Sequence, residues 1–305
     1  MRAIVAEWLF EDGIGEARAA LVEDGRIIAA RIELPGLRLG SVVAGRLMPG
    51  RRVRLEGGME VVLEGPVAVS EGAAVHLLIT REVIPEPGRA KPPRGTISDA
   101  SLAPGPDLRA RLAATGQPVR LCQPHAPDAL EAAGWSDVLE EARIGDIAFA
   151  GGMLRMVATP AMTLFDVDGD GPLDALALAA AGAVAAAIVR HDIGGSIGVD
   201  FPTITGKAAR VAVAAAIDAA LPQPFERTAL NGFGFLQIVR PRPRASLPEL
   251  LHADAGAAAA RALLRRLERT PAGAPAEPVP APIARHITPA WRDALARRTG
   301  RDWSF

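Results

Sequence analysis

Residues 164–171, with the sequence L-F-D-V-D-G-D-G, join an apolar strand to a long alanine-rich helix. The Asp-Gly-Pro run at 170–172 ends the strand and begins the helix. The glycine pair at 194–195 ends the helix. Residues 196–201, S-I-G-V-D-F, then form a short second strand. This order predicts a β-α-β unit with a right-handed crossover, in which two parallel strands lie side by side.

Three aspartates stand where these two strands end. Asp166 and Asp168 are two residues apart on one strand, so both side chains can point to one face, and Asp200 stands near the end of the second strand. Carboxylates that are brought together repel one another, and a divalent cation such as magnesium or manganese compensates for this repulsion. The pattern therefore predicts a metal site with Asp166 and Asp200 as ligands. Asp168 would bind the metal or orient an attacking water.

Acidic residues at a strand-to-helix turn can also serve roles that need no magnesium. Asp170 and Asp174 could simply cap the helix. The spacing also resembles a calcium loop, but Ala177 stands where the bidentate glutamate should be. An apolar strand followed by D-x-D-G resembles the nucleophile motif of haloacid dehalogenase-type phosphatases. In this chain Asp170 replaces the usual threonine of that motif, and no lysine follows Lys207.

The run from residue 151 to 246 resembles the catalytic core of the ribonuclease E/G family. That family has a glycine pair, a threonine-rich approach to an I-D-[IV]-N motif, a helix ending in a basic residue and L-G-G, and a strand with I-D-F. This chain has Gly-Gly at 151–152, T-P-A-M-T-L-F-D-V-D at 159–168, R-H-D-I-G-G at 190–195 and I-G-V-D-F at 197–201. The family's R-F-G-L-L-E-M-[ST]-R is similar to G-F-G-F-L-Q-I-V-R, residues 232–240.

The resemblance implies a magnesium-dependent endoribonuclease that hydrolyses phosphodiester bonds of single-stranded RNA, in RNA processing or decay. Asp166 and Asp200 match the family's two metal-binding aspartates. Asp168 stands where the family has an asparagine that positions the scissile phosphate. The alternative is a non-catalytic RNA-binding paralogue of the same family.

The chain also departs from the family's pattern. It lacks the zinc-linking C-P-x-C motif, so we expect no zinc, and a homo-oligomer would form through another contact. The R-T dipeptide of the family's 5′-monophosphate sensor is missing, and the sensor's later arginine would fall at Arg227 or in the region of Pro224 and Phe225. Residues 40–46 and 80–94 resemble the opening and closing parts of the family's oligonucleotide-binding barrel, in a shortened form.

Composition alone does not indicate a nucleic-acid-binding protein, because the formal net charge is −1. From Arg240 onward, however, the sequence contains twelve arginines and only six acidic residues. These arginines could form a phosphate-facing surface or simply be solvated. Arg240, Arg242 and Arg244 alternate with two prolines, which predicts an extended arm that binds RNA phosphates. Aromatic residues are scarce, and we expect Phe233 and Phe235 to lie in the core rather than to stack on bases.

Turn and periodicity signals divide the chain further. Residues 1–95 are expected to be β-rich, with a hairpin over 17–32 and a degenerate oligonucleotide-binding barrel. Residues 96–145 are expected to be a helical connection (a ribonuclease H-like part by the resemblance), 146–250 an α/β nuclease core, and 251–305 a small C-terminal domain remnant. The expected fold class is therefore mixed α+β and α/β. Helices outside the β-α-β unit are expected over 107–115, 127–142, 207–221, 255–269 and 289–298.

Several features predict a cytoplasmic protein without a membrane segment. The first seven residues lack a signal-peptide pattern, because Glu7 interrupts any apolar run. The most apolar stretch, 175–189, is shorter than the ~20 residues that span a bilayer and is flanked by Asp174 and Arg190, so it is expected to be a buried helix. Cys122 is the only cysteine, which excludes a disulfide or a multi-cysteine zinc site within one chain.

Overall fold

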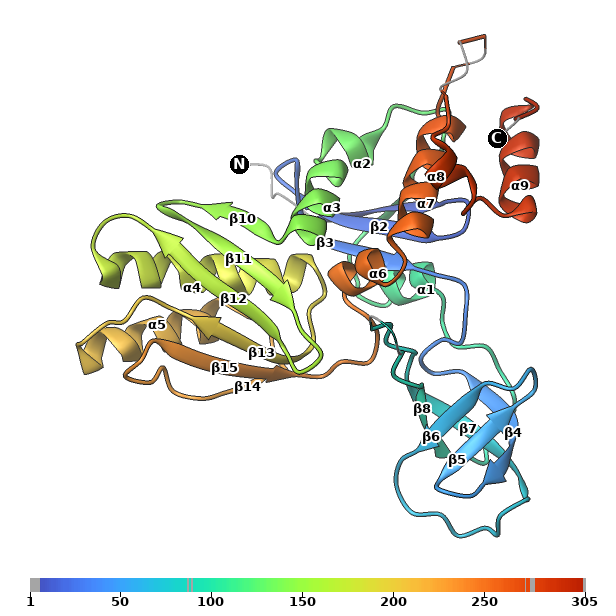
Figure 1. Cartoon of the computed structure of the whole chain (residues 1–305), viewed down its shortest axis with the longest axis horizontal. Coiled ribbons are helices and arrows are strands. Elements are labelled where there is room, and N and C mark those ends of the chain that lie inside the picture. Colours follow the sequence, from blue (N-terminus) through green and yellow to red (C-terminus); the bar gives the residue numbers. More distant parts are fainter. Residues whose placement is uncertain (1–5, 87, 89, 272, 275–277, 304–305) are drawn as a thin grey trace. The chain divides into compact units, whose positions relative to one another are not determined.

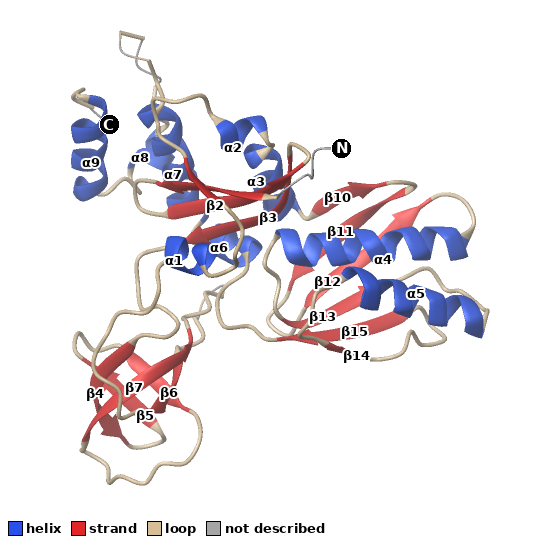
Figure 2. Cartoon of the chain, turned by 180° about the vertical axis from the view of Figure 1, so that it is seen from behind, coloured by secondary structure: helices blue, strands red, loops and turns tan. Residues whose placement is uncertain are grey.

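The computed structural model describes residues 6–86, 88, 90–271, 273–274 and 278–303 (Figures 1 and 2). Residues 1–5, which form most of the N-terminal stretch without a signal-peptide pattern, lie outside the described residues. So do Pro87 and Arg89 of the proline-rich loop. The chain forms two compact units, each discontinuous in sequence: one of residues 1–36, 107–136 and 250–305, the other of residues 37–106 and 137–249.

The first unit contains a four-stranded sheet. Its strands are β1 (Glu7–Asp12), β2 (Ala17–Glu23), β3 (Arg26–Glu33) and β9 (Val119–Leu121), in the order β3-β2-β1-β9. β2 and β3 form the expected hairpin, which turns at Asp24 and Gly25, both with positive φ (50° and 73°). β1 is antiparallel to β2 and parallel to β9, so this sheet joins segments that are far apart in the chain.

Helices from the middle and from the C-terminal part of the sequence complete this unit: α1 (Leu108–Ala113), α2 (Ala129–Ala132), α7 (Ala255–Glu268), α8 (Ala281–Ala284) and α9 (Pro289–Thr299). Leu263, Leu264 and Leu267 of α7 form a core with Leu295 of α9 and with Trp303. Ile14, from the turn that follows β1, belongs to the same core. The expected segment 251–305 thus packs with residues near the N-terminus.

The second unit contains a closed five-stranded barrel. Its strands are β4 (Val42–Met48), β5 (Arg52–Leu55), β6 (Glu60–Leu63), β7 (Ala74–Arg81) and β8 (Arg94–Ile97), in the order β4-β5-β6-β8-β7. β4 pairs with β7 and closes the barrel, while β6 and β8 are parallel. Val53, Val61 and Leu77 are fully buried inside it. The expected segment 1–95 is therefore shared between this barrel and the sheet of the first unit.

The same unit contains a six-stranded sheet, in the order β10-β11-β12-β13-β15-β14. Its strands are β10 (Asp146–Phe149), β11 (Gly152–Ala158), β12 (Thr163–Gly169), β13 (Gly195–Asp200), β14 (Glu226–Arg227) and β15 (Phe235–Arg240). Helices α4 (Leu173–Arg190) and α5 (Lys207–Ala220) cover one face of the sheet: they lie behind it in Figure 1 and in front of it in Figure 2. β12, α4 and β13 form the expected β-α-β unit, with β12 and β13 parallel.

The core of this part lies between the sheet and the two helices. Phe165, Ile197 and Val199 are fully buried, and alanines of α4 such as Ala180 and Ala181 pack against them. Small side chains on α4 bring its backbone close to the sheet, which explains the helix's alanine-rich sequence. α4 is the one helix in the described residues that is long and apolar enough to cross a membrane, but core helices meet the same criteria. Eight of its 18 residues are buried, so the helix is buried along one side and not all round.

Two helices differ from the sequence-based expectation. The segment expected as one helix over 127–142 is divided into α2 and α3 (Trp135–Ile144), because Gly134 between them has a φ of 95°. α6 (Leu247–Ala253) is a helix that was not among those expected from the sequence. The Oε2 of Glu249 accepts hydrogen bonds from the Ser246 backbone N–H and hydroxyl, each at 2.8 Å. This is half of a capping box, and the S-L-P-E sequence is the signal that predicts it.

Candidate functional site

The side chains of β12 alternate strictly between two environments. Phe165 and Val167 are buried beneath the helices, whereas Asp166 and Asp168 are exposed on the opposite face of the sheet. This alternation follows from the period of two along a strand and from the helices covering one face only. The sequence-predicted carboxylates therefore lie on the open face of the six-stranded sheet.

The strand pairing brings Asp200 to the same place. Asp166 and Asp200 are Cα partners in the parallel ladder of β12 and β13, and Asp200 is also exposed. Directly opposed residues on neighbouring strands lie about 5 Å apart and point to the same face. Asp168 lies one step farther along this face, opposite Met153 of β11 and beyond the last β13 partner.

None of the three carboxylates forms a hydrogen bond or ion pair with any other described residue. No group of three or more histidine, cysteine or acidic side chains is close enough to hold a metal ion within the part of the chain that the structure describes. The convergence is therefore a pair, Asp166 and Asp200, with Asp168 next to it. A pair fits magnesium, which commonly takes one or two carboxylates and completes its octahedral shell with water and substrate phosphates.

Arg155, the partner of Asp166 on β11, was not predicted from the sequence as a site residue. Arg155 is exposed, and its Nε lies 3.6 Å from Oδ1 of Asp146 on β10, which is a loose ion pair. Arg155 is two residues after Met153 on β11, so the two side chains point to the same face of the sheet. This alternation is the sequence signal that could have predicted Arg155 on the open face. A guanidinium group beside the acidic pair is suited to contact a phosphate oxygen of an RNA strand.

Asp170 does not cap helix α4. The N-cap of α4 is Pro172, and no side chain caps this helix end. Asp174 is in the first turn, where its charge interacts favourably with the helix dipole.

Arg240, Arg242 and Arg244 do not form the free arm expected from their spacing with the prolines. Arg240 lies within 3.4 Å of the carbonyl of Ile193, Arg242 pairs with Glu249, and Arg244 lies 3.6 Å from Asp192. Burial lowers the pKa of Arg240 from its usual value. The Arg242 and Arg244 side chains are about a quarter exposed (22% and 25%).

These arginines nevertheless line a small cavity. It has a volume of about 50 Å3 and lies between residues 192–194 and 240–244. Gly195, at φ 83°, has the aliphatic part of Arg242 directly beside it, so the glycine pair allows this segment to approach closely. Arg244 has the longest contact of the three arginines and is the best phosphate-contact candidate among them.

Two of the arginines farther along the chain are not part of a phosphate-facing surface. Arg261 and Arg265 of α7 are 6% and 7% exposed. Arg261 binds Glu16 (2.8 Å), and Arg265 binds Glu11 of β1 (3.1 Å) and Asp128 (2.6 Å). The expectation was wrong for these residues, because their acidic partners come from segments that are far away in sequence.

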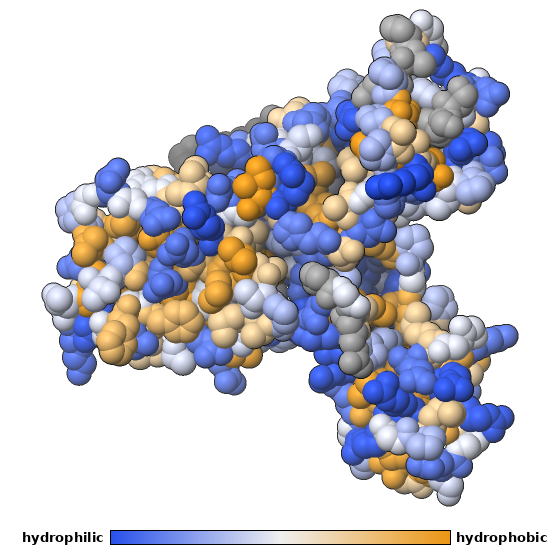
Figure 3. All heavy atoms as spheres, viewed as in Figure 1, coloured by the Kyte–Doolittle hydropathy of each residue, from blue (hydrophilic) through white to orange (hydrophobic). Residues whose placement is uncertain are grey.

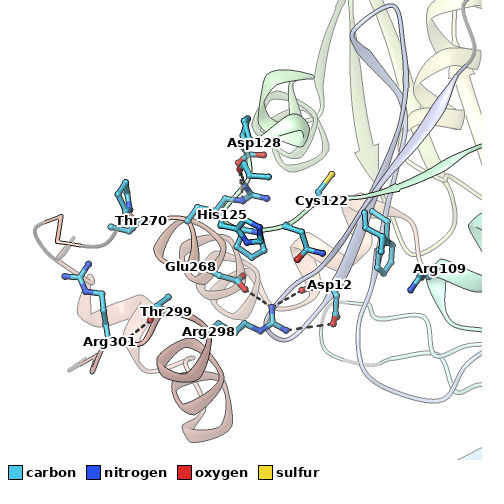
Figure 4. Close-up of a pocket in the computed structure, with 18 residues that line it drawn as sticks. Asp12, Arg109, Cys122, His125, Asp128, Glu268, Thr270, Arg298, Thr299 and Arg301 are labelled. Carbon is cyan, nitrogen blue, oxygen red and sulfur yellow. Dashed lines mark hydrogen bonds and ion pairs between the residues drawn. The ribbon is translucent and has the colours of Figure 1, made fainter.

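A cavity of about 1030 Å3 opens in the first unit, at the carboxyl ends of the parallel strands β1 and β9 (Figure 4). Arg298 crosses it and donates hydrogen bonds to Glu268 Oε1 (2.7 Å) and to the Asp12 carbonyl (2.9 Å). Burial raises the pKa of the Cys122 thiol in its wall, which disfavours a nucleophilic thiolate. The guanidinium group of Arg298 is thus already bound by protein oxygens.

Phe233 contradicts the expectation that it is a core residue. It is 86% exposed, in the turn between β14 and β15, whereas Phe235 is half-buried on the open face. The strand period does not predict this exposure, because Phe233 precedes the strand.

The chain was compared with models of known protein families and with curated proteins, and neither comparison finds a match.

Proposed function

We propose that this chain is a magnesium-dependent endoribonuclease of the ribonuclease E/G type, which hydrolyses phosphodiester bonds in single-stranded RNA. The observation that carries the proposal is the register pairing of Asp166 with Asp200 on the open face of the sheet. Two exposed carboxylates with no described protein partner, side by side on rigid strands, are suited to hold a magnesium ion.

Asp166 and Asp200 would hold the magnesium ion in this proposal. When bound there, magnesium lowers the pKa of a coordinated water and stabilises negative charge on the phosphodiester. Asp168, one step along β12, orients the attacking water through its carboxylate. Arg155, opposite Asp166, contacts a phosphate oxygen and fixes the position of the strand.

The order of the elements agrees with the resemblance found in the sequence. The glycine pair forms the turn between β10 and β11, D-V-D ends β12, and the helix that follows leads through a second glycine pair into the Asp200 strand. The closed five-stranded barrel is of the size used by oligonucleotide-binding folds. Single-stranded RNA is the proposed partner, and cytoplasm is the proposed location. A homo-oligomer would form without a zinc link.

Sensing of the RNA 5′ end is not part of this proposal. Arg227, the one arginine that could match the family's later sensor residue, binds Asp218 of α5 through Nε–Oδ1 (2.7 Å) and a second short contact. This hydrogen-bonded carboxylate raises the pKa of Arg227 and engages its guanidinium group. We therefore expect equal cleavage of 5′-triphosphate, 5′-monophosphate and 5′-hydroxyl RNA.

The test is cleavage of a fluorescein-labelled, AU-rich single-stranded RNA in magnesium, manganese or EDTA. We expect internal cuts in either metal and none in EDTA. RNA binding without cutting in any divalent metal would instead favour the non-catalytic RNA-binding paralogue. The observation that supports this alternative is that Asp168 replaces the family's asparagine.

A second prediction concerns Arg244. Arg244→Gln is expected to weaken RNA binding equally for all sequences and to reduce the slope of log affinity against log salt by about 0.7, the value for one phosphate contact on a single strand. Arg143→Gln removes the same charge from an exposed site on α3 and should leave the slope unchanged. An unchanged slope for Arg244→Gln would show that this residue only binds Asp192.

A further inference from the structure

Phe233 is the most exposed large hydrophobic side chain in the described part of the chain. It lies in the turn 231–234, which connects β14 to β15. A phenylalanine in this position forgoes the hydrophobic stabilisation that burial would give. Single exposed hydrophobic residues are common on protein surfaces, but this one is held by a fixed turn and lies next to the acidic pair.

The turn is fixed by specific bonds. The Asn231 side chain oxygen accepts hydrogen bonds from the backbone N–H groups of Phe233 (2.9 Å) and Phe235 (3.0 Å). Gly234 has a φ of 91°, and a Cβ there would lie 2.2 Å from the carbonyl oxygen of Phe201. These contacts fix the backbone conformation of the turn, and the Phe233 side chain is exposed to solvent on it.

This turn adjoins the acidic pair. Phe235 is the β15 partner of Asp200, and the backbone N–H of Phe201 donates to the carbonyl of Gly234 (2.8 Å). Phe233 is thus two residues from the position that faces Asp200. The exposed ring is therefore carried by the turn that leads directly into the strand beside the proposed metal site.

An apolar floor lies beside the acidic pair. Gly198 precedes Asp200 by two residues and shares its face, and a Cβ there would lie 2.7 Å from Phe235 Cζ, 2.8 Å from Leu164 Cδ2 and 3.1 Å from Met162 Sδ. These three side chains therefore cover Gly198 directly beside the carboxylates. Figure 3 shows hydrophobic residues gathered on this face of the sheet.

We propose that Phe233, together with the floor of Phe235, Leu164 and Met162, is a subsite for an unpaired nucleobase of the RNA strand cleaved at Asp166 and Asp200; the inference rests on the proposed function. Aromatic rings bind bases by stacking, which tolerates any base because every base has a π face. A base in a duplex is already stacked and paired, so this subsite selects single-stranded RNA. A base stacked beside the carboxylates would also hold the RNA strand in position next to the proposed metal site.

The test measures the affinity of a fluorescein-labelled single-stranded RNA for the full chain in magnesium, in an Asp200→Asn background that holds the RNA uncut. Adding Phe233→Ala should weaken binding by about five- to a hundredfold, the range for loss of one stacked base. Adding Phe233→Trp should preserve binding. Val211→Ala, which removes another exposed apolar side chain (60% exposed) from α5, should have no effect.

The outcomes separate the two proposals. If Asp200→Asn binds single-stranded RNA and Phe233→Ala binds it equally well, the nucleobase subsite is wrong and the proposed function stands. If the wild type in magnesium neither cuts nor binds the RNA, both proposals fail. A loss on Phe233→Ala that is equally large for duplex RNA would also overturn the subsite, because a duplex offers no free base. Unchanged circular dichroism and thermal unfolding are expected for Phe233→Ala, since the side chain is exposed.

Discussion

Asp200→Asn is expected to reduce magnesium-dependent cleavage by about a thousandfold or more, since metal-ion stabilisation of a transition state amounts to several kcal/mol and each ~1.36 kcal/mol is tenfold in rate. The substitution preserves the size of the side chain and removes one of the two charges that the strand register places together. Asp166→Asn should have the same effect. Single-turnover cleavage of labelled RNA at saturating enzyme measures this loss without interference from binding.

Asp174→Asn is the matched control for this prediction. It removes a carboxylate from the same strand–helix segment, but from the first turn of α4 rather than from the open face, and it should cleave at the wild-type rate. Asp168→Asn places the family's residue at that position and should retain activity within about tenfold, because Asp166 and Asp200 remain. Cleavage that survives Asp200→Asn unchanged would refute the assignment of the site.

The acidic pair could be predicted because each step used a local signal. Alternation of apolar residues and aspartates placed Asp166 and Asp168 on one face of a strand. The helix between the two strands implied a parallel crossover, which makes the ends of adjacent strands meet. The structure adds the register itself, in which Asp166 faces Asp200 and Asp168 does not face any residue of β13.

The arginine-rich C-terminal segment shows where such prediction ends. The sequence shows a helix with arginines at Arg261, Arg265 and Arg269, and this pattern is the same for a solvated, an RNA-binding or a buried face. The burial of Arg265 depends on its ion pair with Glu11. Glu11 stands 254 residues earlier in the sequence, so the two residues meet only in the folded chain. Phe233 is similar, because its exposure depends on bonds within a turn and not on the period of a strand.

Glu11→Gln is expected to lower the free energy of unfolding of the first unit by about 3–5 kcal/mol, the usual effect of removing one partner from a buried ion network. Glu11 is 2% exposed and contacts three guanidinium groups, those of Arg18, Arg265 and Arg269. Arg18 is itself fully buried. Without the Glu11 charge, these three arginines lose the carboxylate that they share.

Glu7→Gln on the same strand is the matched control. Glu7 pairs with Arg120 at 3.0 Å, but both side chains are exposed (37% and 52%), so this loss should be under about 1 kcal/mol. Urea unfolding monitored by amide hydrogen exchange in β1 and β2 separates the first unit from the second. Equal effects of the two substitutions would mean that the Glu11 network does not stabilise the native state beyond a surface pair.

The pH dependence of Glu11→Gln provides an independent check. Burial raises the pKa of Glu11, but Arg18, Arg265 and Arg269 together outweigh burial and hold it below its ordinary value near 4.5. A carboxyl group whose pKa is lowered in the folded state stabilises that state above its unfolded pKa, and this contribution disappears as the pH falls through the folded pKa. The difference in stability between wild type and Glu11→Gln should therefore be largest at neutral pH and should shrink on acidification below about pH 4.5. A difference that stays constant down to acid pH would show that the lost interaction is steric packing and not the charge of Glu11.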